Sequence, residues 1–283
     1  MSLVAENADI TIREIRDPAQ MRVVEDLQKE VWGIPDLDVV PLTQMVAAKE
    51  AGGVLIGAFD GPTLVGFVYG FPAFEHGQVA HHSHMLAVNP EFRNFDLGRR
   101  LKLAQREHVV KQGVKLITWT FDPLQSLNAH FNFNKLGVVS DRYLVNFYGE
   151  DPASFLHQTG TDRLWVSWFL ESHRVLKRAS GGLNDNELPP GLQLVEVTAD
   201  LSPRRNPAAA LAEDQLSIEI PVDINSLFQQ KPETALRWRE ETRSAFTEAI
   251  KAGYVVVGFD RVTRDNKRFG KYLLVKGSLR DFE

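Results

Sequence analysis

The chain has 283 residues, of which 43% are apolar and 24% charged, and its formal net charge is −5. This composition is typical of a globular protein with one large or two modest domains, and the acidic balance argues against nucleic-acid binding through overall charge. The absence of cysteine excludes disulfides, thiolate metal sites and a cysteine nucleophile.

Membrane and export signals are missing from the sequence pattern. There is no apolar run long enough to cross a bilayer, and the first residues lack the basic and apolar regions of a signal peptide. We therefore expect a cytoplasmic protein without a membrane partner.

The first elements in chain order are a strand, two helices and a hairpin. Residues 9–14 alternate apolar and polar side chains, and Asp17-Pro18 opens a helical pattern that ends at Gly33. A short helix at 42–51 follows. Asp60-Gly61 is a strong hairpin signal between two apolar strands, at 54–59 and 64–71.

The next elements complete a mixed pattern. We expect strands at 78–88, 116–120, 138–147 and 163–169, and helices at 97–112 and 125–136. The order β-α-α-β-β-β-α-β-α-β-β is neither a strict βα alternation nor all-β. It predicts a mixed α+β fold, with helices on both faces of a mixed sheet.

A second region follows a segment with linker composition at 179–190. We expect a first domain over 8–178 and a smaller α+β domain over 190–283. A long helix at 232–252 is predicted from an apolar stripe formed by Trp238, Thr242, Ala245 and Ala249. The second region has only about 90 residues, so we expect its stability to depend on packing against the first.

Most of the candidate catalytic and anion-binding residues lie in the stretch 81–100. Three of the eight histidines lie within 81–84, and an apolar strand, the turn Asn89-Pro90 and an arginine-rich segment follow. A strand, a turn of backbone amides and a helix N-terminus form an anion site, to which Arg93, Arg99 and Arg100 would add charge. An ordinary turn before a solvated helix start explains the same spacing equally well.

Two motifs resemble the GCN5-related N-acetyltransferase (GNAT) superfamily. Its acyl-CoA-binding motif is similar to Leu86-Ala87-Val88-Asn89-Pro90-Glu91-Phe92-Arg93 followed by Leu97-Gly98 and Leu101. Its Asn…Lys-Leu-Gly segment is similar to Asn128-Ala129-His130-Phe131-Asn132-Phe133-Asn134-Lys135-Leu136-Gly137. The predicted order of elements matches this family as well, over residues 8–170.

The resemblance implies a GNAT-like central mixed sheet flanked by helices, and acetyl-CoA or another acyl-CoA, such as succinyl-CoA, as co-substrate. Backbone groups of Leu86, Ala87 and Val88 would face pantetheine, and Asn128 would help to place the thioester end. The pyrophosphate would lie on a turn formed by Arg93, Asn94, Phe95, Asp96, Leu97, Gly98 and Arg99. Asp96 stands where the family pattern has glycine, and aspartate can adopt the same left-handed backbone.

His82 and His84 are candidate catalytic residues. Strand alternation puts them on one face, with His81 and Ser83 on the other. Imidazole titrates in the range needed to take a proton from an amine. The segment 82–88 resembles the strand of arylalkylamine N-acetyltransferases in which paired histidines relay that proton. A structural pair is the alternative, and two imidazoles without a third ligand predict no metal site.

The general acid is harder to assign. The family often has a tyrosine where this chain has Phe133, which cannot donate a proton. Tyr143, Tyr148 or water would take that role. We name Tyr148 as the candidate, while simple packing in a strand is the alternative for both tyrosines.

Further segments resemble an uncharacterised branch of the superfamily with an extra C-terminal region. They are 119–124, 146–149 and 238–243. The resemblance implies N-acylation, particularly N-succinylation, of amino acids, which requires a cationic pocket for a carboxylate. Its candidates are Arg142, Arg163, Arg239 and Arg243, and a structural ion pair is the alternative for each.

The sequence thus predicts an acyl-CoA-dependent N-acyltransferase, acetyl or succinyl, that acts on a small amine by direct attack on the thioester. An amino acid is one candidate acceptor, and a homodimer is left open. The alternative is a degenerate GNAT domain that binds acyl-CoA as a sensor or scaffold without turnover. Asp96 and Phe133 are the residues that support this alternative.

Overall fold

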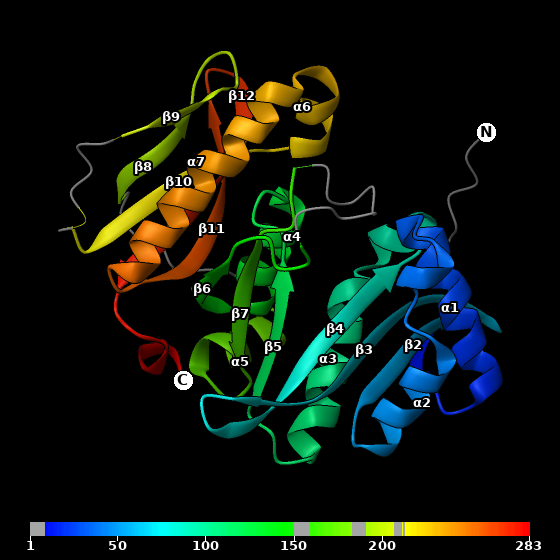
Figure 1. Ribbon diagram of the computed structural model, residues 1–283. Coiled ribbons are helices and arrows are strands. Elements are labelled where there is room, and N and C mark those ends of the chain that lie inside the picture. Colours follow the sequence, from blue (N-terminus) through cyan, green and yellow to red (C-terminus); the bar gives the residue numbers. More distant parts are fainter. Residues whose placement is uncertain (1–8, 150–158, 183–190, 207–210, 212) are drawn as a thin grey trace. The chain divides into compact units, whose positions relative to one another are not determined.

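The computed structural model describes residues 9–149, 159–182, 191–206, 211 and 213–283 (Figure 1). It divides into two compact units, one ending at Thr118 and one running from Trp119 toward the C-terminus. Each unit is described by itself. The division into domains 8–178 and 190–283 stays a prediction, and residues 183–190 of the expected linker lie outside the described residues.

The first unit is a sheet with helices on both faces, as predicted. Its strands are β1 (Ile10–Glu14), β2 (Val54–Asp60), β3 (Thr63–Glu75), β4 (Gln78–Val88) and the start of β5 (Leu116–Phe121). Neighbours along β1-β2-β3-β4 are antiparallel, and β4 pairs with β5 in parallel, at His81↔Ile117 and His82↔Thr118. The helices are α1 (Pro18–Trp32), α2 (Leu42–Glu50) and α3 (Leu97–Lys111).

Local signals in the sequence explain where these elements begin and end. The Asp17 carboxylate accepts a hydrogen bond from the Ala19 N–H and caps α1, which ends at Gly33 in the left-handed conformation. Gly61, with φ of 55°, makes the predicted turn between β2 and β3. Both boundaries confirm the sequence prediction.

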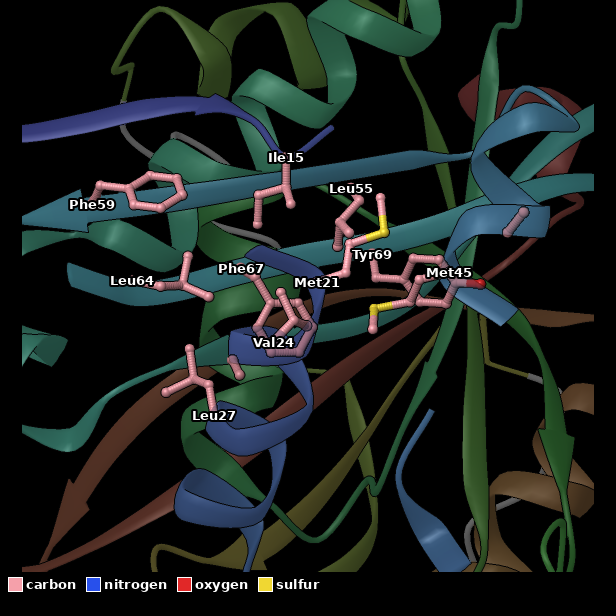
Figure 2. Close-up of a cluster of buried hydrophobic side chains, with 12 residues drawn as sticks. Ile15, Met21, Val24, Leu27, Met45, Leu55, Phe59, Leu64, Phe67 and Tyr69 are labelled. Atoms are coloured by element: carbon pink, nitrogen blue, oxygen red, sulfur yellow. The ribbon is translucent and has the colours of Figure 1, made fainter. Parts of the chain in front are cut away.

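The core of the first unit lies between the sheet and the helices α1 and α2 (Figure 2). Met21, Val24 and Leu27 of α1 pack there against strand residues such as Leu55 and Phe67. The other face carries α3, whose buried residues include Leu101, Gln105 and Val109. The side chains of β4 therefore point either toward α1 and α2 or toward α3 on the opposite face.

A β-bulge interrupts β4. Tyr69 lies opposite Met85 and Gly70 lies opposite Ser83, so His84 has no residue opposite it on β3. A bulge shifts the alternation of side chains by one position. Met85 and Ala87 consequently pack in the core on the α1–α2 side.

The second unit contains both the last strands of the predicted first domain and the C-terminal region. Its strands pair in the order β7-β6-β11-β12-β10-β8-β9. They are β6 (Val139–Leu144), β7 (Arg163–Phe169), β8 (Leu192–Val197), β9 (Pro203–Arg205), β10 (Gln215–Pro221), β11 (Tyr254–Arg264) and β12 (Lys267–Lys276). β6 meets β11 at Ser140↔Val256, so a strand from each region shares one ladder.

The helices of the second unit are α4 (Ser126–His130), α5 (His173–Ala179), α6 (Ile224–Gln230) and α7 (Pro232–Lys251), and a π-helix (Phe131–Leu136) extends α4. The predicted stripe of α7 is confirmed, since Trp238, Thr242, Ala245 and Ala249 are all buried. α6 was not predicted. Within the described residues, no helix has the length and apolar character needed to span a membrane.

Candidate functional site

The His82 ring is held from both sides on the α1–α2 face of β4. Its Nδ1 lies 3.1 Å from the Oγ1 of Thr118, a fully buried residue in the neighbouring strand β5. The centroid of its ring lies 5.6 Å from that of Phe71 on β3. His82 is thus an anchored, half-buried imidazole.

His84 is on the same face, as alternation predicts. Its ring centroid lies 5.7 Å from that of Phe71 and 6.1 Å from that of Tyr69. The residue is exposed, yet the protein atoms packed around the ring displace water and lower the pKa of His84. A lowered pKa keeps the imidazole neutral at pH 7, the state that can accept a proton.

The opposite face of β4 holds a buried polar chain. Lys102 Nζ donates to Gln105 Oε1 at 2.9 Å, and the Gln105 amide lies 3.2 Å from His81 Nε2. Burial, reinforced by the charge of Lys102, lowers the pKa of His81 to about 3, so its ring is neutral and accepts from the amide. A Cβ on Gly70 would lie only 2.4 Å from His81 Nε2, and this close approach explains the glycine.

The turn after β4 has the backbone that the sequence predicts for an anion cradle. The 3₁₀ helix Pro90–Phe95 leads into Asp96, which takes the left-handed conformation with φ of 53° and precedes α3. The first hydrogen bond of α3 runs from the Arg100 N–H to the Asp96 carbonyl, so the Leu97 and Gly98 amides precede the hydrogen-bonded part of the helix. The Asp96 carboxylate lies 3.8 Å from the Arg99 guanidinium.

The arginines of this turn have different surroundings. Arg93 is exposed and Arg99 half-buried. Arg100 donates from Nη2 to the Ile10 carbonyl at 2.7 Å, so its side chain contacts β1, and its part in phosphate binding stays a prediction. Arg93 and Arg99 remain candidates, whereas the side chain of Asn94 is outside the described part.

The other expected ligands of CoA in the first unit lie on β4 and at the start of α3. Leu86, Ala87 and Val88 pair with Val68, Phe67 and Gly66 of β3, which occupies one edge of β4. Phe95 is half-buried, and its ring centroid lies 6.0 Å from that of Phe92. Leu97 is buried in full, so only its backbone amide can serve a ligand.

Asn128 and Phe133 belong to the second unit. Asn128 is exposed on α4. Phe133 is 1% exposed and lies edge-on to Phe121 and to Tyr272 of β12, with ring centroids 6.3 and 5.8 Å away. Phe133 is therefore a core residue shared with the C-terminal region, which the sequence pattern did not reveal.

The two tyrosine candidates also lie in the second unit. The Tyr143 hydroxyl donates to Asp162 Oδ2 at 2.7 Å, and burial raises the pKa of Tyr143 far above its usual range. Tyr148 is 52% exposed, and its ring lies 5.0 Å from the guanidinium of Arg163. Tyr143 is thus half-buried and tied to a buried acid, and Tyr148 is the more exposed of the two.

The four arginine candidates for a carboxylate pocket make internal contacts. Arg239 Nη2 lies 2.7 Å from Asp122 Oδ1, and Arg243 reaches both oxygens of Asp162 at 2.8 and 2.9 Å. Arg163 donates to the Asp162 carbonyl, and Arg142 lies over Trp165. The ion-pair alternative therefore holds for Arg239 and Arg243. Sequence reasoning missed both acids, although Asp122-Pro123 directly follows a buried strand.

Metal ligation has no visible basis in the described ranges, where no three His, Asp or Glu side chains gather. The first unit thus brings together His82, His84 and the Asp96 turn, all on or next to β4. Such an arrangement can move protons beside a bound anion.

Part of the chain matches a family of known proteins. The model of the acetyltransferase (GNAT) family matches residues 13–138. A comparison with curated protein sequences finds no match.

Solved structures with a similar trace include three acetyltransferases. The ribosomal-protein-S18-alanine N-acetyltransferase of Escherichia coli is 11% identical, with 63% of this chain and 98% of that chain covered and a TM-score of 0.46. The aminoglycoside 6'-N-acetyltransferase of Enterococcus faecium is 20% identical, with 56% and 97% covered and a TM-score of 0.43. The yncA protein of Salmonella typhimurium, solved with its cofactor acetyl-CoA, is 14% identical, with 59% and 96% covered and a TM-score of 0.45.

The GNAT match begins near the end of β1 and ends just before β6, and further strands and helices follow. Residues 13–138 are therefore similar to the acetyltransferase (GNAT) family, and the chain continues beyond that match with an extra C-terminal region.

Proposed function

We propose that this protein is an acyl-CoA-dependent N-acyltransferase that transfers an acetyl or succinyl group to a small amine, such as an amino acid. The match of residues 13–138 to the acetyltransferase (GNAT) family supports acetyl transfer in general. The observation that carries the proposal is the pair His82 and His84 on one face of β4, together with the left-handed turn at Asp96 between the end of β4 and α3. β4 thus carries the proposed base, and the turn that follows β4 forms the proposed anion site.

The turn fits a pyrophosphate. Asp96 has the backbone that a glycine would give, and its carboxylate lies near Arg99, which offsets its charge. Amides at the start of α3 and the helix dipole favour an anion there. Arg93, Phe95, Leu97 and Gly98 complete the turn, and Leu86, Ala87 and Val88 would offer backbone groups to pantetheine.

In the proposed reaction, a bound acyl-CoA supplies an activated thioester carbonyl. The histidine pair, with His84 neutral at pH 7, takes the proton of the acceptor ammonium and moves it to solvent. The free amine attacks the carbonyl, and backbone amides of the β4 segment stabilise the oxyanion. The attached nitrogen then loses its second proton to the histidine pair as the C–S bond breaks and the thiolate leaves. Water protonates the thiolate, whereas the roles of Tyr148 as general acid and of Asn128 at the thioester end stay predictions from the sequence.

Calorimetry with acetyl-CoA, succinyl-CoA and free CoA tests binding, and an amine screen at pH 6–9 tests turnover. H82A/H84A should lower turnover at neutral pH at least about a hundredfold, the usual worth of general base catalysis, with CoA affinity nearly unchanged. H173A, which removes an exposed histidine, is the matched control. Turnover by the double variant equal to wild type across this range would refute the relay, and CoA binding without any turnover would favour a sensor.

A further inference from the structure

We propose that Thr118 is the positioning residue of this relay. Its hydroxyl lies 3.1 Å from the Nδ1 of His82 and holds the ring in one orientation while the ring gains and loses a proton. This inference rests on the proposed function, and it names a residue that neither the family motifs nor the strand pattern assigned.

The geometry leaves the hydroxyl little freedom. Thr118 is 0% exposed and lies opposite His82 in the parallel pairing of β4 with β5. A β-branched side chain in a strand is stiff at χ1, so the 3.1 Å contact holds the ring in one orientation. A buried hydroxyl requires a hydrogen-bond partner, and the Nδ1 of His82 provides it.

A hydroxyl suits a ring that gains and loses a proton. When Nδ1 carries no proton, the Thr118 O–H donates to it. When the ring is an imidazolium, the Nδ1–H donates to Oγ1 instead. A carboxylate at this position would hold the imidazolium, and a methyl group would support neither state. Threonine therefore serves both halves of a relay cycle.

The other titratable groups around His82 are distributed over both faces of the sheet. Tyr69 and His84 lie on the same face, where Phe71 contacts both imidazoles. His81 is on the opposite face, and Lys102 and His108 of α3 act on it electrostatically. His81 and Lys102 are buried, and both have lowered pKa values. We therefore expect the effect of T118V near pH 7 to be a change in the titration of His82.

The test compares T118V, which keeps the shape of the side chain, with T118S, which keeps the hydroxyl. Histidine NMR with ¹⁵N labelling reads the tautomer and titration of His82, and kcat/KM is measured from pH 6 to 9. We expect T118V to change the tautomer ratio, shift the titration of His82 and lower kcat about tenfold, with KM for acetyl-CoA unchanged. T118S should remain within about threefold of wild type.

The result that would overturn the proposal is a T118V protein whose His82 tautomer, titration and pH profile match wild type. A loss in T118S equal to that in T118V would overturn it as well, because the hydroxyl would then be irrelevant. The NMR readout does not need turnover. A wild type without activity whose His82 still responds to T118V would refute the proposed transferase, while a wild type with activity whose His82 ignores T118V would refute the role of Thr118.

Discussion

Replacing Arg239 by methionine should destabilise the protein strongly. Arg239 of α7 is 3% exposed, and its guanidinium reaches Asp122 Oδ1 at 2.7 Å, the Thr159 carbonyl at 3.0 Å and the Thr159 hydroxyl at 3.1 Å. The side chain of Asp122 is itself only 10% exposed. R239M therefore leaves a buried carboxylate without its cation.

The size of the effect follows from that burial. Removing one partner of a buried ion pair typically costs about 3–5 kcal/mol, far more than the ~0–1 kcal/mol of an exposed pair. Arg237 lies two residues earlier on the same helix and is exposed, so R237M is the matched control, with an expected change within about 0.5 kcal/mol.

Urea unfolding followed by tryptophan fluorescence measures the difference, since Trp119, Trp168 and Trp238 are all buried in the same unit. D122N/R239M should recover part of the loss, because it removes both charges together. The reasoning is wrong if R239M unfolds at the same urea concentration as R237M, or if the double variant is less stable than the sum of the single ones.

Three further predictions concern the first unit. G70A should cost about 1–3 kcal/mol in thermal or urea unfolding, because the new Cβ would lie 2.4 Å from His81 Nε2, and a wild-type midpoint would contradict this. Since the pKa of His81 falls to about 3 on folding, the unfolded chain binds more protons between pH 6.5 and 3. Stability should therefore be full above about pH 6.5 and fall by up to about 1.4 kcal/mol per pH unit as the solution is acidified. H81Q should flatten that slope, and an unchanged slope would show that other groups cause it. D96N should tighten CoA binding about fivefold in calorimetry, because it removes a carboxylate near the pyrophosphate and asparagine keeps the left-handed backbone. Equal or weaker binding would place that carboxylate away from the phosphates.

Features that depend on local sequence were predicted well. The turn at Gly61, the stripe of α7 and the left-handed Asp96 each follow from residues within a few positions. The shared face of His82 and His84 was predicted from alternation, which holds up to the bulge. The bulge itself leaves no mark in the pattern, because an unpaired residue is defined by the register of the partner strand.

The features that sequence reasoning missed are those that join distant segments. Thr118 is an unremarkable strand residue until β5 is placed beside β4. Phe133 seemed to mark a lost catalytic group, but Tyr272 packs on its ring from the far end of the chain. Asp122 meets Arg239 across more than a hundred residues. Such pairings are set by the tertiary fold, and no periodicity records them.

The pairing between β6 and β11 affects what happens when the C-terminal region is removed from the chain. β6 has β7 on one side and meets β11 on the other at Ser140↔Val256. Cutting the chain before β11 would turn an interior strand into an edge strand, with unpaired N–H and C=O groups that invite pairing with another molecule. A fragment that ends before β11 should therefore self-associate more than the full chain.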